Sequence, residues 1–301
     1  MAQGADSGKA VVFALGANFA IALTKYVAAA ITGSGSMFAE AVHSTADCGN
    51  QLLLLLGMKR SRRSPTLDYP LGFGKETYFW SFMVAILLFS LGGMFSIYEG
   101  WHKLHATEEL KSPLLALGVL AFGIGAEGFS MWGALREVNK SRGAQNLWAW
   151  FRGSRNAELV VIFGEDLAAL VGLSFAFVAV LATWITANPL YDALGGIAIG
   201  VLLVIVAVAV AIQVKAMLIG QGVEAPVRAE MMAFLEGRPE IERVIELLTL
   251  HMGGDVMVAV KAKVRSQGDE SAFVDKINEI EAAFKERFPQ VQWTFFEPDV
   301  R

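Results

Sequence analysis

The chain contains six apolar runs, each long enough to form a membrane-spanning helix. A helix needs about 20 apolar residues to cross the roughly 30 Å hydrocarbon core of a bilayer. The runs are Ala10–Thr32, Met37–Gly57, Tyr78–Tyr98, Pro113–Leu135, Leu159–Ala187 and Pro189–Val214. The segment Ala187-Asn188-Pro189 predicts a tight turn between the last two runs. We therefore expect a membrane all-α domain of six transmembrane helices over residues 1–220.

The pattern changes near residue 221, and residues 221–301 predict a small cytosolic α+β domain. Apolar and polar residues alternate through Asp255–Val264, which predicts a strand. Apolar residues recur at helical spacing through Asp269–Arg287, which predicts an amphipathic helix. The expected order is α-β-β-α-β, over Pro226–Glu236, Ile241–Leu250, Asp255–Val264, Asp269–Arg287 and Val291–Phe296. We expect Gly253-Gly254 to form a hairpin turn and Pro298 to end the last strand.

The composition narrows the class of protein. Hydrophobic residues make up 54% of the chain and charged residues 18%, with a mean hydropathy of +0.48. These values exclude a disordered chain, a coiled coil and an ordinary soluble enzyme. The net charge of −4 argues against a nucleic-acid partner. The single cysteine, Cys48, excludes a disulfide framework and a cysteine-based zinc module.

Lysine and arginine residues gather on one side of the expected membrane domain. That side holds Lys59, Arg60, Arg62, Arg63, Lys75, Arg136, Lys140, Arg142, Arg152 and Arg155, whereas the other holds only Lys103 and Lys111. The positive-inside rule then predicts that both termini and the C-terminal domain are cytoplasmic. The lean loops favour a bacterial inner membrane. The first apolar run is too long for a secretory signal peptide.

Ionisable residues inside membrane helices mark functional sites, because an Asp at mid-membrane costs about 2.5–3.5 kcal/mol. In the second run, His43 and Asp47 are four residues apart and share one helix face. Glu40 and Asn50 extend this polar stripe. An imidazole and a carboxylate at this spacing can chelate one divalent ion. The alternative is a hydrogen-bonded pair that only orients the helices.

The fifth run carries the adjacent carboxylates Glu165 and Asp166. Adjacent residues cannot share one helix face, so we expect one of them to face the stripe of the second run. Ser36 and Asn156 are plausible helix caps, which place Asp47 and Asp166 at a similar depth of about 15 Å. Two carboxylates and one imidazole suit Zn²⁺, Mn²⁺, Fe²⁺ or Co²⁺.

Several ionisable residues of the apolar runs allow a second interpretation. Glu127 either pairs with Lys25 or assists the metal site, and Glu165-Asp166 could instead pack against Lys25. Asp192 either caps the sixth helix or lies beside an entry path.

The segment Ala39–Gln51, with its His43-xxx-Asp47 motif, resembles the cation diffusion facilitator (CDF) family of divalent-metal/proton antiporters. The loop Asp68–Glu76 resembles a loop of the same family. The resemblance covers nearly the whole chain and is greatest to the branch that contains the human zinc transporter nine. It implies six membrane helices, a cytosolic C-terminal domain and a homodimer formed through that domain.

The resemblance also implies a set of metal ligands. His43, Asp47 and Asp166 match ligand positions of the family, and Glu165, Asn50 or water would complete the site. Ile162 stands where the family has another ligand. Tyr69 and Phe73 replace the histidines of a second site, and His251 is the only histidine of the cytosolic domain. We therefore expect one transport site, without deciding whether His251 binds metal.

These features together predict a secondary transporter rather than an enzyme. It would export a divalent cation from the cytosol in exchange for protons, by alternating access around a midplane site. Zn²⁺ is the first candidate, followed by Mn²⁺, Fe²⁺, Co²⁺ or Cd²⁺; the ion is the substrate, and no resident cofactor is expected. The alternative is a metal-sensing or scaffold membrane protein that does not transport. A membrane metalloenzyme is disfavoured because the chain has no HExxH motif.

Overall fold

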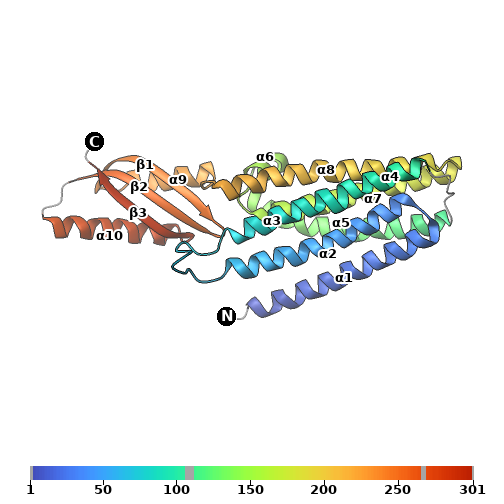
Figure 1. Cartoon of the computed structure of the whole chain (residues 1–301). Coiled ribbons are helices and arrows are strands. Elements are labelled where there is room, and N and C mark those ends of the chain that lie inside the picture. The colour runs from blue at the N-terminus through green and yellow to red at the C-terminus, as the bar shows by residue number, and fades with distance from the viewer. Residues whose placement is uncertain (1–2, 106–111, 266–268, 300–301) are drawn as a thin grey trace.

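The computed structural model describes residues 3–105, 112–265 and 269–299, with side chains from residue 15 onward except Ala17. Long helices lie side by side in one elongated bundle, and a small sheet with two helices lies at one end (Figure 1). The bundle consists of α1 (Gln3–Thr32), α2 (Gly35–Ser61), α3 (Glu76–Leu87), the π-helical segment η1 (Leu88–Met94), α4 (Phe95–Leu104), α5 (Pro113–Arg142), α6 (Leu147–Gly153), α7 (Ala157–Thr186) and α8 (Leu190–Ile219).

Within the described residues, four helices are long and apolar enough to cross a membrane. They are the continuous helix Glu76–Leu104, which joins α3, η1 and α4, together with α5, α7 and α8. The described apolar part of α1, Asn18–Thr32, is shorter. Helix α2 has sufficient length, but the polar residues between Glu40 and Gln51 lower its hydropathy. The protein is therefore a largely helical membrane protein with a small C-terminal α/β domain.

Local sequence explains where several helices begin and end. Ser34 and Asn156 cap α2 and α7 by accepting hydrogen bonds from backbone amides three residues ahead. The cap of α2 lies two residues before the predicted one, Ser36. Ala187 ends α7 with a positive φ of 54°, which confirms the predicted break before α8. Helix α6 was not predicted; Asn146 caps it, and Trp150 packs into the core.

Two apolar cores divide the bundle along its length. The core nearer the C-terminal domain includes Val160 and Phe163 of α7, and the farther core includes Leu173 and Val180 of the same helix. In α5 the order is reversed, because that helix runs in the opposite direction to α7. The polar residues of α2, α5 and α7 fall between the two cores. The chain thus buries a polar layer near the middle of the bundle.

The C-terminal domain has the predicted order α-β-β-α-β. Its elements are α9 (Ala225–Glu236), β1 (Ile241–Met252), β2 (Asp255–Val264), α10 (Glu270–Arg287) and β3 (Val291–Asp299). The sheet order is β1-β2-β3, with β1 and β2 antiparallel and β2 and β3 parallel. Alternate residues of β2 are buried against apolar side chains of both helices, which confirms the period-two prediction.

Two details of this domain concern the turn and the strand ends. Gly253 has a φ of +81°, which a hairpin turn requires, so the predicted turn is confirmed. Strand β3 continues past Pro298 to Asp299, so the predicted strand end is wrong. β3 is an edge strand, and prolines within a sheet are tolerated at such edges.

Candidate metal site

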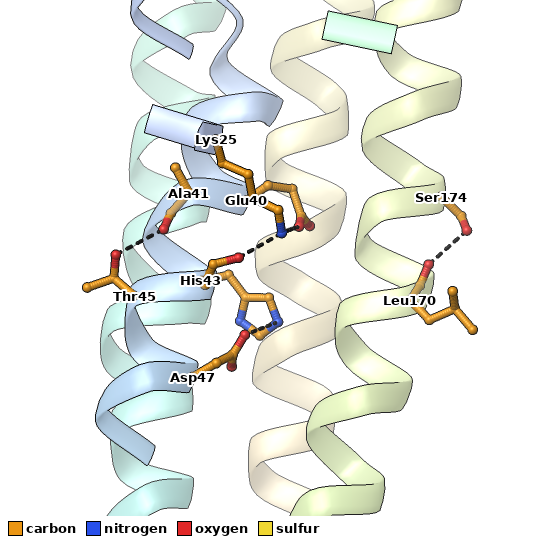
Figure 2. Close-up of polar contacts among 9 residues, drawn as sticks. Lys25, Glu40, Ala41, His43, Thr45, Asp47, Leu170 and Ser174 are labelled. Carbon is orange, nitrogen blue, oxygen red and sulfur yellow. Dashed lines mark hydrogen bonds and ion pairs between the residues drawn. The ribbon is translucent and has the colours of Figure 1, made fainter. Parts of the chain in front are cut away.

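The polar stripe of α2 lies on one buried face of that helix. Glu40, His43 and Asn50 are at most 1% exposed. His43 Nε2 lies 3.7 Å from Asp47 Oδ2, one helical turn further along α2 (Figure 2). The ring of His43 also faces η1, because a Cβ on Gly92 would lie 3.8 Å from His43 Nδ1. The helix therefore presents an imidazole and a carboxylate together in the polar layer of the bundle.

The two adjacent carboxylates of α7 point to different helices. Glu165 is buried and accepts a hydrogen bond from the side-chain amide of Asn50 on α2. Asp166 accepts a hydrogen bond of 3.1 Å from the hydroxyl of Ser130 on α5. The residue that contacts the α2 stripe directly is thus Glu165, while Asp166 approaches from the side of α5.

A cavity of about 90 Å³ lies between α1, α2, α5 and α7. This volume is large enough to hold water or a single metal ion. Carboxylates from three helices line it: Asp47, Glu127, Glu165 and Asp166. The other lining residues are Asn18, Ile21, Ser44, Gln51, Ala126, Ser130 and Ala169. A small cavity with this excess of negative oxygen atoms attracts a cation.

Several buried polar atoms around the cavity lack a hydrogen-bond partner within the described part of the chain. They are both ring nitrogens of His43, Asp47 Oδ1, Asn50 Oδ1 and Gln51 Oε1. Buried polar atoms in folded proteins nearly always have a partner, which can be an ion or water. Most of these atoms carry a lone pair that can accept a hydrogen bond or bind a metal ion. They therefore suit a metal cation better than an anion.

The predicted ligands lie in or beside the cavity without converging on one point, and neither His43 nor Asn50 is part of its lining. Among the described residues, no three His, Cys, Asp or Glu side chains form a group that could hold a metal ion. Asp47, Glu165 and Asp166 line the cavity, whereas His43 lies outside its lining and is linked to it through Asp47. Ile162 stands where the family that the sequence resembles has another ligand, and its side chain is 40% exposed on α7.

Lys25 and Asp192 have partners that the sequence did not indicate. Lys25 Nζ lies 3.3 Å from Glu40 Oε2, so it pairs with neither Glu127 nor Glu165-Asp166 as the alternatives proposed. Asp192 does not cap its own helix. It caps α2, accepting hydrogen bonds from the Gly35 amide at 2.6 Å and the Ser34 hydroxyl at 2.7 Å.

Four polar residues of the cavity were not singled out from the sequence: Asn18, Ser44, Gln51 and Ser130. Gln51 and Ser130 each lie about one helical turn beyond a singled-out carboxylate, Asp47 and Glu127 respectively. This spacing places them on the same helix face. Asn18 lies on α1, at the point where its apolar run is interrupted. A position one helical turn from a membrane-buried carboxylate was the signal that could have identified Ser44, Gln51 and Ser130. No carboxylate lies within one turn of Asn18, so that signal does not reach it.

A second cavity, of about 550 Å³, lies where the C-terminal domain meets the bundle. The turn at Gly253 docks against the start of α3, where the Tyr78 hydroxyl donates to Gly253 O at 3.2 Å and accepts from Gly253 N at 3.1 Å. Arg155 adds a 2.8 Å hydrogen bond to the carbonyl of Gly222. His251 and Glu224 both line this cavity. His251 therefore lies at the junction between the domain and the bundle, apart from the polar stripe of α2.

His251 gives the C-terminal domain a predicted pH dependence. Burial lowers the pKa of His251 below its ordinary value, although the Glu224 carboxylate opposes that effect. The unfolded domain therefore binds more protons than the folded domain as the pH falls through about 6.5, and the domain loses stability on acidification. We expect amide exchange in β1 and β2, corrected for intrinsic rate, to speed up severalfold between about pH 7.5 and 5.5. His251→Gln should flatten this change; an unchanged pH profile in that variant would contradict the assignment.

Comparison with known proteins identifies the helical part. Residues 11–219 match the family described as the cation efflux transmembrane domain. This match covers most of the bundle, including all of the helices that line the first cavity.

Relatives extend the similarity into the C-terminal domain. The proton-coupled zinc antiporter SLC30A9, mitochondrial, of Xenopus laevis is 34% identical over 266 residues, which are 87% of this chain and 47% of that protein. Its Homo sapiens counterpart is 31% identical over 82% of this chain and 44% of its own length. Metal tolerance protein C4 of Arabidopsis thaliana is 31% identical over 80% of this chain and 53% of its own length. The chain thus spans about half the length of these curated relatives.

Proposed function

Because the chain belongs to the cation efflux family, in the branch of the zinc antiporters just described, we propose that it exchanges a divalent metal cation for protons across a membrane. The observation that carries this proposal is the small cavity walled by carboxylates from α2, α5 and α7. Zn²⁺ is the first candidate substrate, because relatives are named as zinc antiporters. Mn²⁺, Fe²⁺, Co²⁺ and Cd²⁺ are the other ions to test.

Six helices would cross the membrane in this proposal. They are α1, α2, the continuous helix Glu76–Leu104, α5, α7 and α8. The polar stripe of α2 faces the protein interior, where lipid does not reach it, which supports its placement as a span. The transport domain would comprise residues 1–220 and the cytosolic domain residues 221–301.

The metal would bind among Asp47, Glu165 and Asp166, with His43 and Asn50 completing the site. Asp47 already lines the cavity, and His43 Nε2 lies 3.7 Å from Asp47 Oδ2, so a rotation of the His43 side chain would bring its imidazole toward the same space. Asn50 already holds Glu165 in place. Protons compete with a metal ion for carboxylate and imidazole groups, so loading the metal releases protons and couples the two fluxes through one site.

We place the C-terminal domain and both termini in the cytoplasm. The basic residues of the α2–α3 and α5–α7 connections lie at the same end of the bundle as the C-terminal domain, where Arg155 contacts Gly222. For this chain we propose a bacterial inner membrane, which its lean loops support; the animal relatives are named as mitochondrial. Export from the cytosol then means movement toward the far end of the bundle, where α2 and α8 begin.

A second copy of the chain would cover the open face of the C-terminal sheet. Leu248 and Phe295 are 57% and 56% exposed on the face that α9 and α10 leave uncovered. Together with Glu246 and Lys261 they line a groove of about 240 Å³. An apolar patch with opposite charges at its rim suits a self-complementary contact, which supports the proposed homodimer.

Metal-driven proton movement in sealed proteoliposomes tests the function. Zn²⁺ added outside should raise the internal pH in vesicles of the wild-type protein, because protons leave as the metal enters. Asp47→Ala should lose this response while the protein stays folded. A wild type that binds Zn²⁺ without moving protons or metal would favour a metal sensor or scaffold. Hydrolysis of a lipid or peptide by the purified protein would instead indicate an enzyme.

A further inference from the structure

A buried ion pair lies beside the candidate metal site and belongs to neither its cavity nor its proposed ligands. Lys25 Nζ on α1 lies 3.3 Å from Glu40 Oε2 on α2 (Figure 2). The same ammonium donates a 2.7 Å hydrogen bond to Ser44 Oγ. Lys25 is 2% exposed and Glu40 is fully buried. Removing two charges from water is costly, and a buried ion pair is weak evidence for stability alone. Its presence in the middle of a membrane bundle calls for a functional account.

The pair lies on the side of the site that faces away from the C-terminal domain. Glu40 precedes His43 by about one helical turn in the direction of Gly35, where α2 begins. On the other side of His43, Asp47 and Gln51 line the cavity. Ser44 joins the two regions, because it both lines the cavity and accepts the hydrogen bond from Lys25. An ion leaving the cavity toward the far end of the bundle therefore meets Lys25 and Glu40 first.

The pair is packed tightly across the bundle. A Cβ on Gly172 of α7 would lie 2.8 Å from Glu40 Oε1, so the carboxylate rests directly against that helix. A Cβ on Gly123 of α5 would lie 3.9 Å from Lys25 Cε. Ion-pair contacts thus extend from α1 and α2 to α5 and α7. A larger residue at position 172 would require the Glu40 carboxylate to shift.

Beyond the pair, the bundle is closed by apolar packing and a polar cap. Leu120, Leu173 and Ile199 of the far core are fully buried. At the far end, Asp192 of α8 caps the start of α2, and Lys103 of α4 donates to the carbonyl of Gly33. A metal ion would have to displace each of these layers in turn to leave in this direction. Among these three barriers in the described residues, only the ion pair places charged groups next to the candidate metal site.

We infer that the Lys25–Glu40 pair is a charge barrier that closes the far half of the metal path, and that Lys25 must leave Ser44 before the ion can pass. This inference rests on the proposed transport function. An ammonium group repels a divalent cation strongly where the effective dielectric constant is low. Pairing with Glu40 keeps the ammonium in place, so the barrier opens only when α1 and α2 rearrange together. Exchange then stays tied to that rearrangement instead of becoming a leak.

Replacing Lys25 separates this role from a structural one. Lys25→Met removes the charge and keeps the length, whereas Lys25→Arg keeps the charge. In proteoliposomes with a Zn²⁺ gradient and no pH gradient, we expect Lys25→Met to raise Zn²⁺ movement without matching proton movement by about tenfold, and Lys25→Arg to stay coupled. Lys215→Met is the matched control, because Lys215 is exposed on α8. Coupled exchange in Lys25→Met at the wild-type ratio of protons to zinc would overturn the inference.

A binding measurement keeps the inference testable if Lys25→Met is inactive. Removing the ammonium should tighten Zn²⁺ binding in detergent by about tenfold, and Glu40→Gln should weaken it by a similar factor, because the two charges act on the ion with opposite signs. A purely structural pair would weaken binding in both variants, and that result would overturn the inference. If the wild type itself moves no metal, the transport proposal fails. The binding comparison still tests whether the charge of Lys25 weakens Zn²⁺ binding at the site.

Discussion

Asp47→Asn should weaken Zn²⁺ binding by about a hundredfold or more, because it removes a charge that faces the ion in a buried cavity. Asp47 lines the cavity and also lies 3.7 Å from the imidazole of His43. One of its oxygens has no hydrogen-bond partner within the described residues. Asn has the same shape as Asp, so helix packing should be preserved. Isothermal titration calorimetry of the purified protein in detergent measures the effect.

Asp68→Asn is the control for this experiment. Asp68 is exposed in the loop between α2 and α3, within the segment that resembles a family motif. We expect its replacement to leave Zn²⁺ affinity within about twofold of the wild type, because solvent screens an exposed charge. Equal affinities for Asp47→Asn and the wild type would show that the ion binds elsewhere. Equal losses in both variants would point instead to the loop as part of the site.

Gly74→Ala should detach the C-terminal domain from the start of α3. A Cβ at this position would lie 1.7 Å from the carbonyl oxygen of Met252 and 2.6 Å from its carbonyl carbon. Both atoms belong to the backbone of the β1–β2 hairpin, so the hairpin must move away. The two hydrogen bonds between Tyr78 and Gly253 would then break. At about 0.5–1.5 kcal/mol each, their loss should speed exchange of the Gly253 amide by about tenfold or more.

Gly254→Ala is the matched control, because a Cβ on Gly254 meets nothing within 4 Å. Both variants add one methyl group at the contact, Gly74→Ala before α3 and Gly254→Ala in the hairpin turn. Hydrogen exchange read by mass spectrometry over the hairpin should therefore change in Gly74→Ala and stay close to the wild type in Gly254→Ala. Unchanged exchange in Gly74→Ala would mean that the docking contact is not formed in solution.

The sequence predicted most of the fold because its signals are local. Long apolar runs mark the helices, and period-two burial in β2 marks the sheet. The errors arose where a tertiary contact overrides the local signal. Helix α6 depends on Trp150 reaching the core, and β3 continues through Pro298 because it lies at the edge of the sheet.

Partners of buried charges were harder to predict than the charges themselves. The spacing of His43 and Asp47 placed them on one face, as helical geometry requires. Nothing in the spacing distinguishes which of Glu165 and Asp166 approaches α2, since that depends on how α7 is rotated against its neighbours. The same holds for Lys25, whose partner Glu40 lies on another helix, and for Asp192, which caps the start of α2.

The most direct test of the account is Zn²⁺ accumulation driven by an imposed pH gradient. Sealed proteoliposomes with an acidic interior would be diluted into neutral buffer containing Zn²⁺, and internal Zn²⁺ would be followed over time. We expect the wild type to accumulate Zn²⁺ against its gradient, Asp47→Asn to accumulate none, and Zn²⁺ to rank above Mn²⁺, Fe²⁺, Co²⁺ and Cd²⁺. A wild-type protein that binds Zn²⁺ but accumulates none under this gradient would contradict it.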